Sequence, residues 1–223
     1  MPAGPHYDFA HAAAALIAIA VLLSGLALLL VKQVHEQVRT YAVQSLFAAG
    51  YTLLVGIDRA DVALIVLAAW TAVIKVILIP VAIDRAVTSP VSEHEVPLVV
   101  QVPMSLLIGV TLAGLAYWSA SALPIHAALL PAPALGMPLS LVLIGFFFMI
   151  TRQNVISQIV GLLTLENGVF LATVAIAPGL PFAIGFLLLL DLLPAVVFYG
   201  VFARLIAARA KTTSIEDMAV LRG

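Results

Sequence analysis

The segment NVISQIVGLLTLENGVFLATVAIA, Asn154–Ala177, is the stretch of this sequence that most directly indicates the fold. It runs for 24 residues, and Glu166 is its only charged side chain. A helix needs about 20 mainly apolar residues to cross the hydrocarbon core of a bilayer. The segment therefore predicts a membrane-spanning helix that carries a carboxyl group in its interior.

The composition of the whole chain extends this prediction beyond that segment. Of 223 residues, 64% are hydrophobic and 9% are charged, and the mean hydropathy is +1.20. Soluble domains contain about 45–50% apolar and roughly 25% charged residues, so a soluble globular enzyme is excluded, as is a disordered chain. We predict an all-α, polytopic transmembrane helical bundle of about seven spans, forming a single integral membrane domain over residues 1–223.

Charged residues and clusters of Pro and Gly divide the chain into seven predicted spans. Between the fourth and fifth spans, residues 119–138 contain Pro124, Pro131 and Pro133, which break helical hydrogen bonding. We expect a loop or a short interfacial helix there. The predicted spans are Phe9–Val31, Thr40–Ile57, Asp61–Ile83 (bent near its end by Pro80), Val96–Ser119, Gly136–Ile150, Asn154–Ala177 and Pro181–Ile206.

The distribution of Lys and Arg supports this count and predicts an orientation. With seven spans, eight basic residues fall on one side of the membrane and only Arg59 on the other. The excess of positive charge in cytoplasmic loops then places the N-terminus outside and the C-terminus in the cytoplasm. The eight residues are Lys32, Arg39, Arg85, Arg152, Arg204, Arg209, Lys211 and Arg222.

Three ionisable side chains, Lys75, Glu166 and Asp191, lie inside predicted spans. Each raises the free energy of membrane insertion by at least about 2.5 kcal/mol. Counted from the nearest basic residue on the cytoplasmic side, their depths are roughly 15, 21 and 20 Å at 1.5 Å per residue. All three are therefore predicted near the middle of the bilayer. We expect Glu166 to contact an ionisable or amide group of another helix, with Asp191 and Lys75 the first candidates.

Amide side chains extend this set of candidate pathway residues. Asn154, Gln158, Leu162 and Glu166 follow an i, i+4 spacing, which predicts a polar stripe on one helix face. Gln44 lies in the second predicted span. For the amides, packing between helices is the simpler interpretation. For Glu166 and Asp191, an ion or proton relay is favoured, and Lys75 is either a relay member or a fixed counter-charge.

A weak internal repeat is also present. Gln44 and Lys75 are 31 residues apart, and Gln158 and Asp191 are 33 apart. In each pair, the first residue would lie on a span that begins at the cytoplasmic side, and the second residue would lie on the following span. This suggests a duplicated helical hairpin in parallel orientation, with repeat units 1–95 and 136–210 joined by the fourth span and the Pro-rich loop.

Three segments carry a resemblance to a known family. TRQNVISQIVGLLTLENGVF (Thr151–Phe170), RTYAVQSL (Arg39–Leu46) and KVILIP (Lys75–Pro80) resemble hydrogenase-4 component E, a membrane subunit of group 4 [NiFe] hydrogenase and formate hydrogenlyase complexes. The second half of that family is similar to the K-type subunit of complex I and to the C-type subunit of multisubunit cation/proton antiporters. Those subunits carry two intramembrane carboxylates. Glu166 falls where the first would, and Asp191 is the candidate for the second, where Glu is typical.

The resemblance implies a membrane-arm subunit of a complex-I-like, redox-driven respiratory assembly that moves protons or sodium ions across a bacterial or archaeal cytoplasmic membrane. The implied partners are antiporter-like membrane subunits, a quinone-module-like membrane subunit and peripheral hydrogenase-type subunits, which would hold the nickel–iron and iron–sulfur centres.

This chain has no Cys to ligate such centres and shows no catalytic residue pattern. As a membrane protein it is expected to be surrounded by lipid. Its net charge of −1 gives no basic face for nucleic acid. Two alternatives stay open: a purely structural subunit that scaffolds antiporter-like chains, and an independent small ion transporter.

Overall fold

The structure, a computed structural model, describes residues 5–86, 100–122 and 135–177. These residues are almost entirely helical and contain no β-strand. The predicted all-α fold is therefore confirmed. The elements are α1 (Pro5–Leu30), α2 (Val34–Asp58), α3 (Val62–Thr71), the π-helix η1 (Ala72–Leu78), α4 (Ile79–Ala86), α5 (Val102–Ser121), α6 (Gly136–Thr151) and α7 (Val155–Ile176).

The helices have the length and composition of membrane spans. In the described part of the chain, α1, α2, α5, α7 and the continuous helix formed by α3, η1 and α4 are long and apolar enough to cross a bilayer, and α6 is a shorter apolar helix. These helices confirm the prediction of a membrane protein. The seventh predicted span, Pro181–Ile206, and most of the Pro-rich segment lie outside the described residues.

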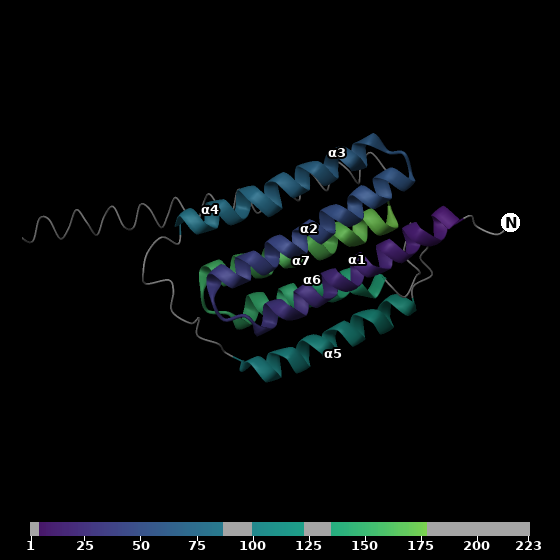
Figure 1. The fold of residues 1–223 in the computed structure, drawn as a ribbon. Helices are drawn as coiled ribbons and strands as arrows, with labels where there is room; N and C mark the ends of the chain where they lie inside the picture. The colour runs from purple at the N-terminus through teal and green to yellow at the C-terminus, as the bar shows by residue number, and fades with distance from the viewer. Residues whose placement is uncertain (1–4, 87–99, 123–134, 178–223) are drawn as a thin grey trace, which may run out of the picture.

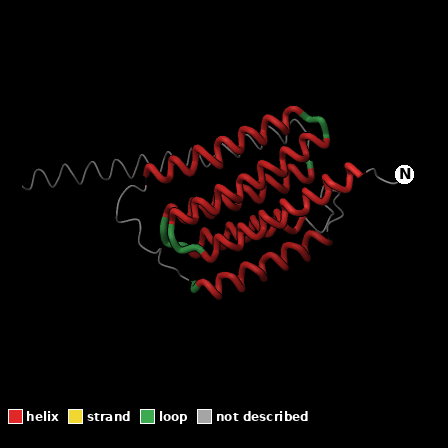
Figure 2. The backbone as a smooth tube through the Cα atoms, in the orientation of Figure 1, coloured by secondary structure: helices red, strands yellow, loops and turns green. Residues whose placement is uncertain are grey.

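Four helices form a closed ring at the centre of the bundle. In this ring α1 packs on α2, α2 on α7, α7 on α6 and α6 on α1. The helix of α3, η1 and α4 packs against α2 on one side of the ring, and α5 packs against α1 and α6 on the other side (Figures 1 and 2). The helices are connected by short loops where the loops are described, so successive helices run in opposite directions. Arg152, between α6 and α7, donates hydrogen bonds to the carbonyls of Leu29 and Val31 at the end of α1. The neighbours α2 and α7 therefore begin at the same end of the bundle and are parallel (Figure 1).

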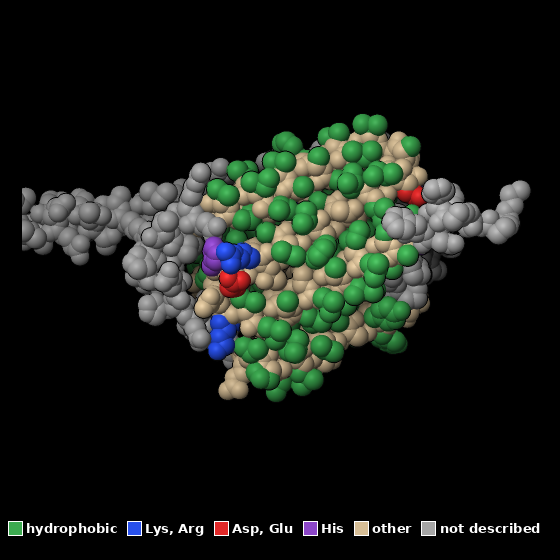
Figure 3. Space-filling model, in the orientation of Figure 1, with side chains coloured by type: hydrophobic (Ala, Val, Ile, Leu, Met, Phe, Trp, Pro, Cys, Tyr) green, Lys and Arg blue, Asp and Glu red, His purple; other side chains and the backbone are tan. Residues whose placement is uncertain are grey.

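The outer surface of the bundle is apolar over its length. Leu16 is 67% exposed, Val66 is 61% exposed and Trp118 is 70% exposed. Figure 3 shows hydrophobic side chains covering the visible face, with the charged side chains at its two ends. Such a surface is unfavourable in water and matches the hydrocarbon interior of a bilayer.

Two helices begin six residues away from the predicted positions. The second span begins at Val34 instead of Thr40, because polar residues of the first turns are accommodated in the helix. Gln37 is buried there and its amide donates to the Val31 and Lys32 carbonyls, 3.3 and 3.5 Å away. The fourth span begins at Val102 instead of Val96, with a Pro in its first turn, a position that tolerates the missing N–H.

Candidate functional site

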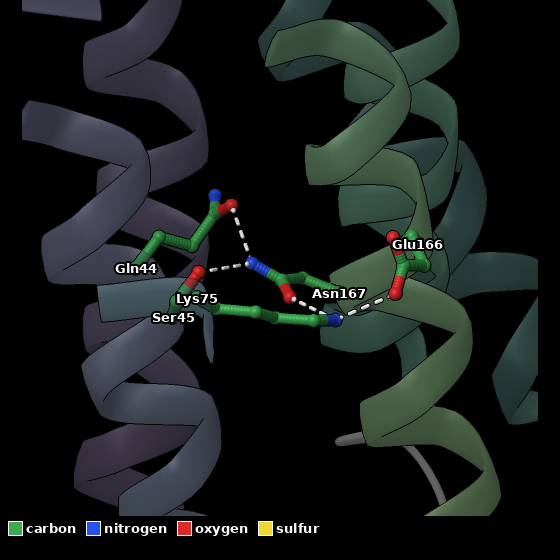
Figure 4. Close-up of polar contacts among 5 residues, drawn as sticks. All are labelled: Gln44, Ser45, Lys75, Glu166 and Asn167. Carbon is green, nitrogen blue, oxygen red and sulfur yellow. Dashed lines mark hydrogen bonds and ion pairs between the residues drawn. The ribbon is translucent and has the colours of Figure 1, made fainter. Parts of the chain in front are cut away.

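Lys75 and Glu166 form a buried ion pair between two helices of the bundle. The Lys75 ammonium lies 2.7 Å from Glu166 Oε1, and the two side chains are 0% and 7% exposed. Lys75 comes from η1 and Glu166 from α7, so residues 91 positions apart meet inside the protein (Figure 4). This contact confirms that Glu166 pairs with an ionisable group of another helix and that the two residues share a depth.

Asn167 connects this ion pair to α2. Its side-chain carbonyl accepts a hydrogen bond from Lys75 at 3.1 Å, and its amide nitrogen donates to Ser45 Oγ at 2.9 Å and to Gln44 Oε1 at 3.3 Å. Figure 4 shows these five side chains converging from three elements. We name Gln44, Ser45, Lys75, Glu166 and Asn167 the polar cluster.

The polar cluster occupies the middle of the bundle. Glu166 lies eleven residues after the first residue of α7 and ten before the last. On both α2 and α7, the cluster separates two apolar cores: Tyr41 and Leu163 belong to one, and Ala48 and Phe170 to the other. Because apolar side chains pack on both sides of the cluster, the hydrogen bonds and the ion pair act in a lower dielectric than water and are strengthened.

The backbone around Lys75 is a π-helix instead of an α-helix. The segment η1 spans Ala72–Leu78 within an otherwise α-helical span. Pro80 has no N–H group, so it cannot donate to the carbonyl of Val76 as an α-helix requires. Such π-segments are uncommon and are frequent at functional sites. Here the segment carries Lys75, whose side chain is completely buried and passes 5.2 Å from the centre of the Phe170 ring.

Close packing of α7 on α6 fixes the position of Glu166. A Cβ on Gly161 would lie 2.8 Å from the Met149 nitrogen, and one on Gly168 would lie 2.7 Å from the Val142 nitrogen. Gly145 of α6 makes a similarly close approach to the backbone at Leu165. Glycines at these positions let the two backbones meet, and Asn167, on another face of α7, is then presented to α2.

Two other predicted site residues, Asn154 and Gln158, lie apart from the polar cluster. Asn154 caps α7 by accepting a 2.8 Å hydrogen bond from the Ile156 N–H. Gln158 is exposed and donates to the Arg152 carbonyl at 2.9 Å. The predicted polar stripe from Asn154 through Gln158 to Glu166 is therefore wrong. The buried polar face of α7 instead holds Ser157, Thr164 and Asn167. Asp191 lies outside the described residues.

Sequence reasoning missed Ser45 and Asn167 as site residues. The signal was adjacency: Asn167 directly follows Glu166, and Ser45 directly follows Gln44. Both amide and hydroxyl groups are also common in helix packing, so the sequence does not distinguish a site residue from a packing residue.

Arg152 is a further buried cation, located at the end where α7 begins. It is 3% exposed, and one guanidinium nitrogen donates to the carbonyls of Leu29 and Val31 at 3.2 and 3.4 Å. The guanidinium lies 4.6 Å from the centre of the Phe148 ring. Burial lowers the pKa of Arg152 to about 10, so the side chain stays charged at neutral pH. It closes the open carbonyl end of α1, a favourable place for a cation.

The chemistry that this arrangement supports is proton exchange. An ammonium and a carboxylate 2.7 Å apart share a hydrogen-bonded proton, so the protonation of one is coupled to that of the other. Among the described residues, His, Asp and Glu form no group of three or more that could hold a metal ion.

Comparisons with known proteins give one informative match. No protein-family model matches the sequence, and no solved structure matches it. A Mycobacterium tuberculosis protein, described as uncharacterized protein Rv0085, is 32% identical to this chain over 168 residues. The matched region covers 74% of this chain and 75% of that protein.

Proposed function

The chain belongs to the same family as Rv0085 of Mycobacterium tuberculosis, and we propose that it is a membrane-arm subunit of a redox-driven, complex-I-like assembly of the group 4 hydrogenase type. In this assembly it contributes to the movement of protons or sodium ions across a bacterial or archaeal cytoplasmic membrane. Its partners are antiporter-like and quinone-module-like membrane subunits and peripheral hydrogenase-type subunits. The redox centres belong to those peripheral subunits.

The buried pair of Lys75 and Glu166 is the observation that carries this proposal. Taking either charge alone to the centre of a bilayer is unfavourable by at least about 2.5 kcal/mol on insertion scales. Apolar side chains of similar size would fill the same space without that penalty. Ionisable residues inside the membrane therefore generally mark ion or proton pathways.

The contacts suggest how the pair works. Proton transfer from Lys75 to Glu166 would convert the charged pair into a neutral one. Uptake of a second proton by Lys75, together with release of the proton held by Glu166, would restore both charges and move one proton through the pair. Asn167 holds the Lys75 nitrogen at 3.1 Å and is itself fixed to α2 through Ser45 and Gln44. Movement of α2 relative to α7 would change the geometry of the pair, which gives partner subunits a mechanical connection to its protonation.

Replacing Glu166 tests the proposal. Glu166→Gln keeps the size and a hydrogen-bonding group but removes titration. We expect the assembled complex to form and its redox reaction with artificial electron carriers to persist, while ion translocation into membrane vesicles falls strongly. Glu166→Asp should have a milder effect, because shortening the side chain stretches a relay that requires contacts of about 2.6–3.2 Å.

A scaffold role is the second candidate, and one observation favours it. Lys75 makes two hydrogen bonds within the polar cluster, as a pair that fixes the register of two helices would. In that case a fully assembled Glu166→Gln complex would translocate ions at the normal rate. That result would remove the relay role of Glu166 and leave the scaffold role standing.

A further inference from the structure

Buried polar atoms that lack a hydrogen-bond partner gather in one half of the bundle. In the described part of the chain they include Gln37 Oε1 and Gln44 Nε2 on α2, and the hydroxyls of Ser157 and Thr164 on α7. Two nitrogens of the Arg152 guanidinium, Nε and Nη1, join them. All five side chains belong to residues that are at most 3% exposed.

Apart from those of Arg152, which lies just before α7, these atoms lie on the buried faces of α2 and α7, two helices that pack on each other. The hydrogen bonds of Asn167 set the register of the parallel helices α2 and α7, because they place Asn167 opposite Gln44 and Ser45. Thr164 and Ser157 precede Asn167 by three and ten residues, and Gln37 precedes Gln44 by seven. Such spacings return to the same side of a helix. The atoms therefore form a series from Arg152, at the end of the bundle, to the polar cluster at its centre.

The other half of the same interface is apolar. Beyond Asn167, the residues that α7 buries are Gly168, Phe170, Leu171, Val174 and Ala175. On α2 the Thr52 hydroxyl is bonded to the Ala48 carbonyl of its own helix at 3.0 Å. One buried polar atom in this half lacks a partner, the Tyr51 hydroxyl. Tyr51 lines a small cavity whose other walls are apolar: Ile17, Ala18, Val21, Met137, Pro138 and Leu171.

Unpartnered polar atoms inside a membrane protein need an explanation. A buried hydroxyl or amide without a hydrogen bond is destabilising by about 1–3 kcal/mol, and in a bilayer no surrounding solvent relieves this. Ordered water is the usual partner of such groups, and one water bonds to about three of them. A row of waters would satisfy all five residues of this series together.

We propose that a file of water runs between α2 and α7 from the Arg152 end of the bundle to the polar cluster, and stops there. The Lys75–Glu166 pair is then open to water from one side only. Phe170 and the apolar residues after it seal the other side, and Arg152 donates hydrogen bonds to the first waters of the file. The hydration follows from the side chains alone; its use as the route for protons rests on the proposed function.

Single cysteines can test this directly, because the chain contains no Cys. The variants are Ser157→Cys and Thr164→Cys in the proposed file, with Leu171→Cys and Val174→Cys as controls on the buried face of the same helix. The probe is the silver ion, which is small, travels through water and binds thiolates. It is added to vesicles that expose either end of the bundle, and the thiols left unblocked are counted with a fluorescent maleimide after unfolding in detergent.

We expect silver to block Ser157→Cys and Thr164→Cys from the Arg152 end and not from the opposite end. Leu171→Cys and Val174→Cys should react at least about ten-fold more slowly, because a thiol in dry surroundings is held in its unreactive, protonated form. Equal, slow reaction of all four variants would overturn the water file. Equal access to Thr164→Cys from both ends would overturn its one-sidedness.

A replacement variant and an independent readout keep the test decisive. Val160→Cys, on the same face between Ser157 and Thr164 and fully buried, takes the place of either variant that fails to give a monodisperse protein. Labelling does not depend on ion transport. If silver labels the variants as expected and Glu166→Gln still translocates ions normally, the water file stands and the relay is removed. If all four thiols react slowly and Glu166→Gln loses translocation, the relay stands and the water file is removed.

Discussion

At the scale of single residues, the balance of charge at the polar cluster decides whether the bundle is stable. Each ion loses its hydration when it is buried, which is unfavourable by several kcal/mol. The Lys75–Glu166 contact and the hydrogen bond to Asn167 offset that loss only while both charges are present. The stability of the fold is therefore coupled to the site, and removing one partner should be worse than removing both.

A double-mutant cycle on the pair should show this coupling. We expect Lys75→Met to lower the free energy of unfolding by about 3–5 kcal/mol, because it leaves the Glu166 carboxylate buried without a counter-charge. Adding Glu166→Leu should recover part of this loss, with a coupling energy of about 1–3 kcal/mol. Unfolding in mixed detergent and SDS micelles measures both quantities. Additive effects would show that the two side chains do not interact in the folded protein.

At the scale of the elements, the glycines of α7 determine which of its faces meets α6 and which meets α2. Gly161 and Gly168 face α6, so the residues beside them on α7 determine what α2 contacts. The absence of a side chain at Gly161 and Gly168 therefore determines where Glu166 and Asn167 point.

Two glycines with opposite surroundings provide a matched test. Gly161→Ala should lower the free energy of unfolding by about 1–3 kcal/mol, because the new Cβ would lie 2.8 Å from the Met149 nitrogen and 3.0 Å from the Gly145 carbonyl oxygen. Gly50→Ala should raise it by up to about 1 kcal/mol, since nothing lies within 4 Å and Ala favours a helix. If the two substitutions have the same sign, the close crossing of α6 and α7 is wrong.

The elements also show what the sequence could predict. Apolar runs placed the described spans to within about six residues, and the shared depth of Lys75 and Glu166 followed from counting residues to the nearest basic side chain. The polar face of α7 did not follow, because an i, i+4 rule selected Gln158, whereas the glycines direct Ser157, Thr164 and Asn167 inward. The π-helix at Lys75 depends on a hydrogen-bond register that no residue pattern specifies.

At the scale of the whole molecule, the two ends of the bundle differ in charge. Lys32, Arg39 and Arg152 lie at the end where α2 and α7 begin, as the contact of Arg152 with the last carbonyls of α1 requires. Arg59 lies at the opposite end, directly after α2. By the positive-inside rule, we expect the Arg152 end to face the cytoplasm.

Reporter fusions at these two ends should reveal the orientation. Alkaline phosphatase, which is active only outside the cytoplasm, should be inactive when fused after Gln33 or Gln153 and active when fused after Arg59. The three sites lie in connections between described helices, so each reports one end of the bundle. The opposite pattern would place the Arg152 end outside.

The Lys75–Glu166 pair would keep its depth at mid-membrane with either orientation. If the Arg152 end is outside, the proposed water file would supply the pair from the outer side. The sidedness of silver labelling and the sidedness of the fusions must therefore agree, and disagreement would show that the path to the polar cluster does not follow α2 and α7.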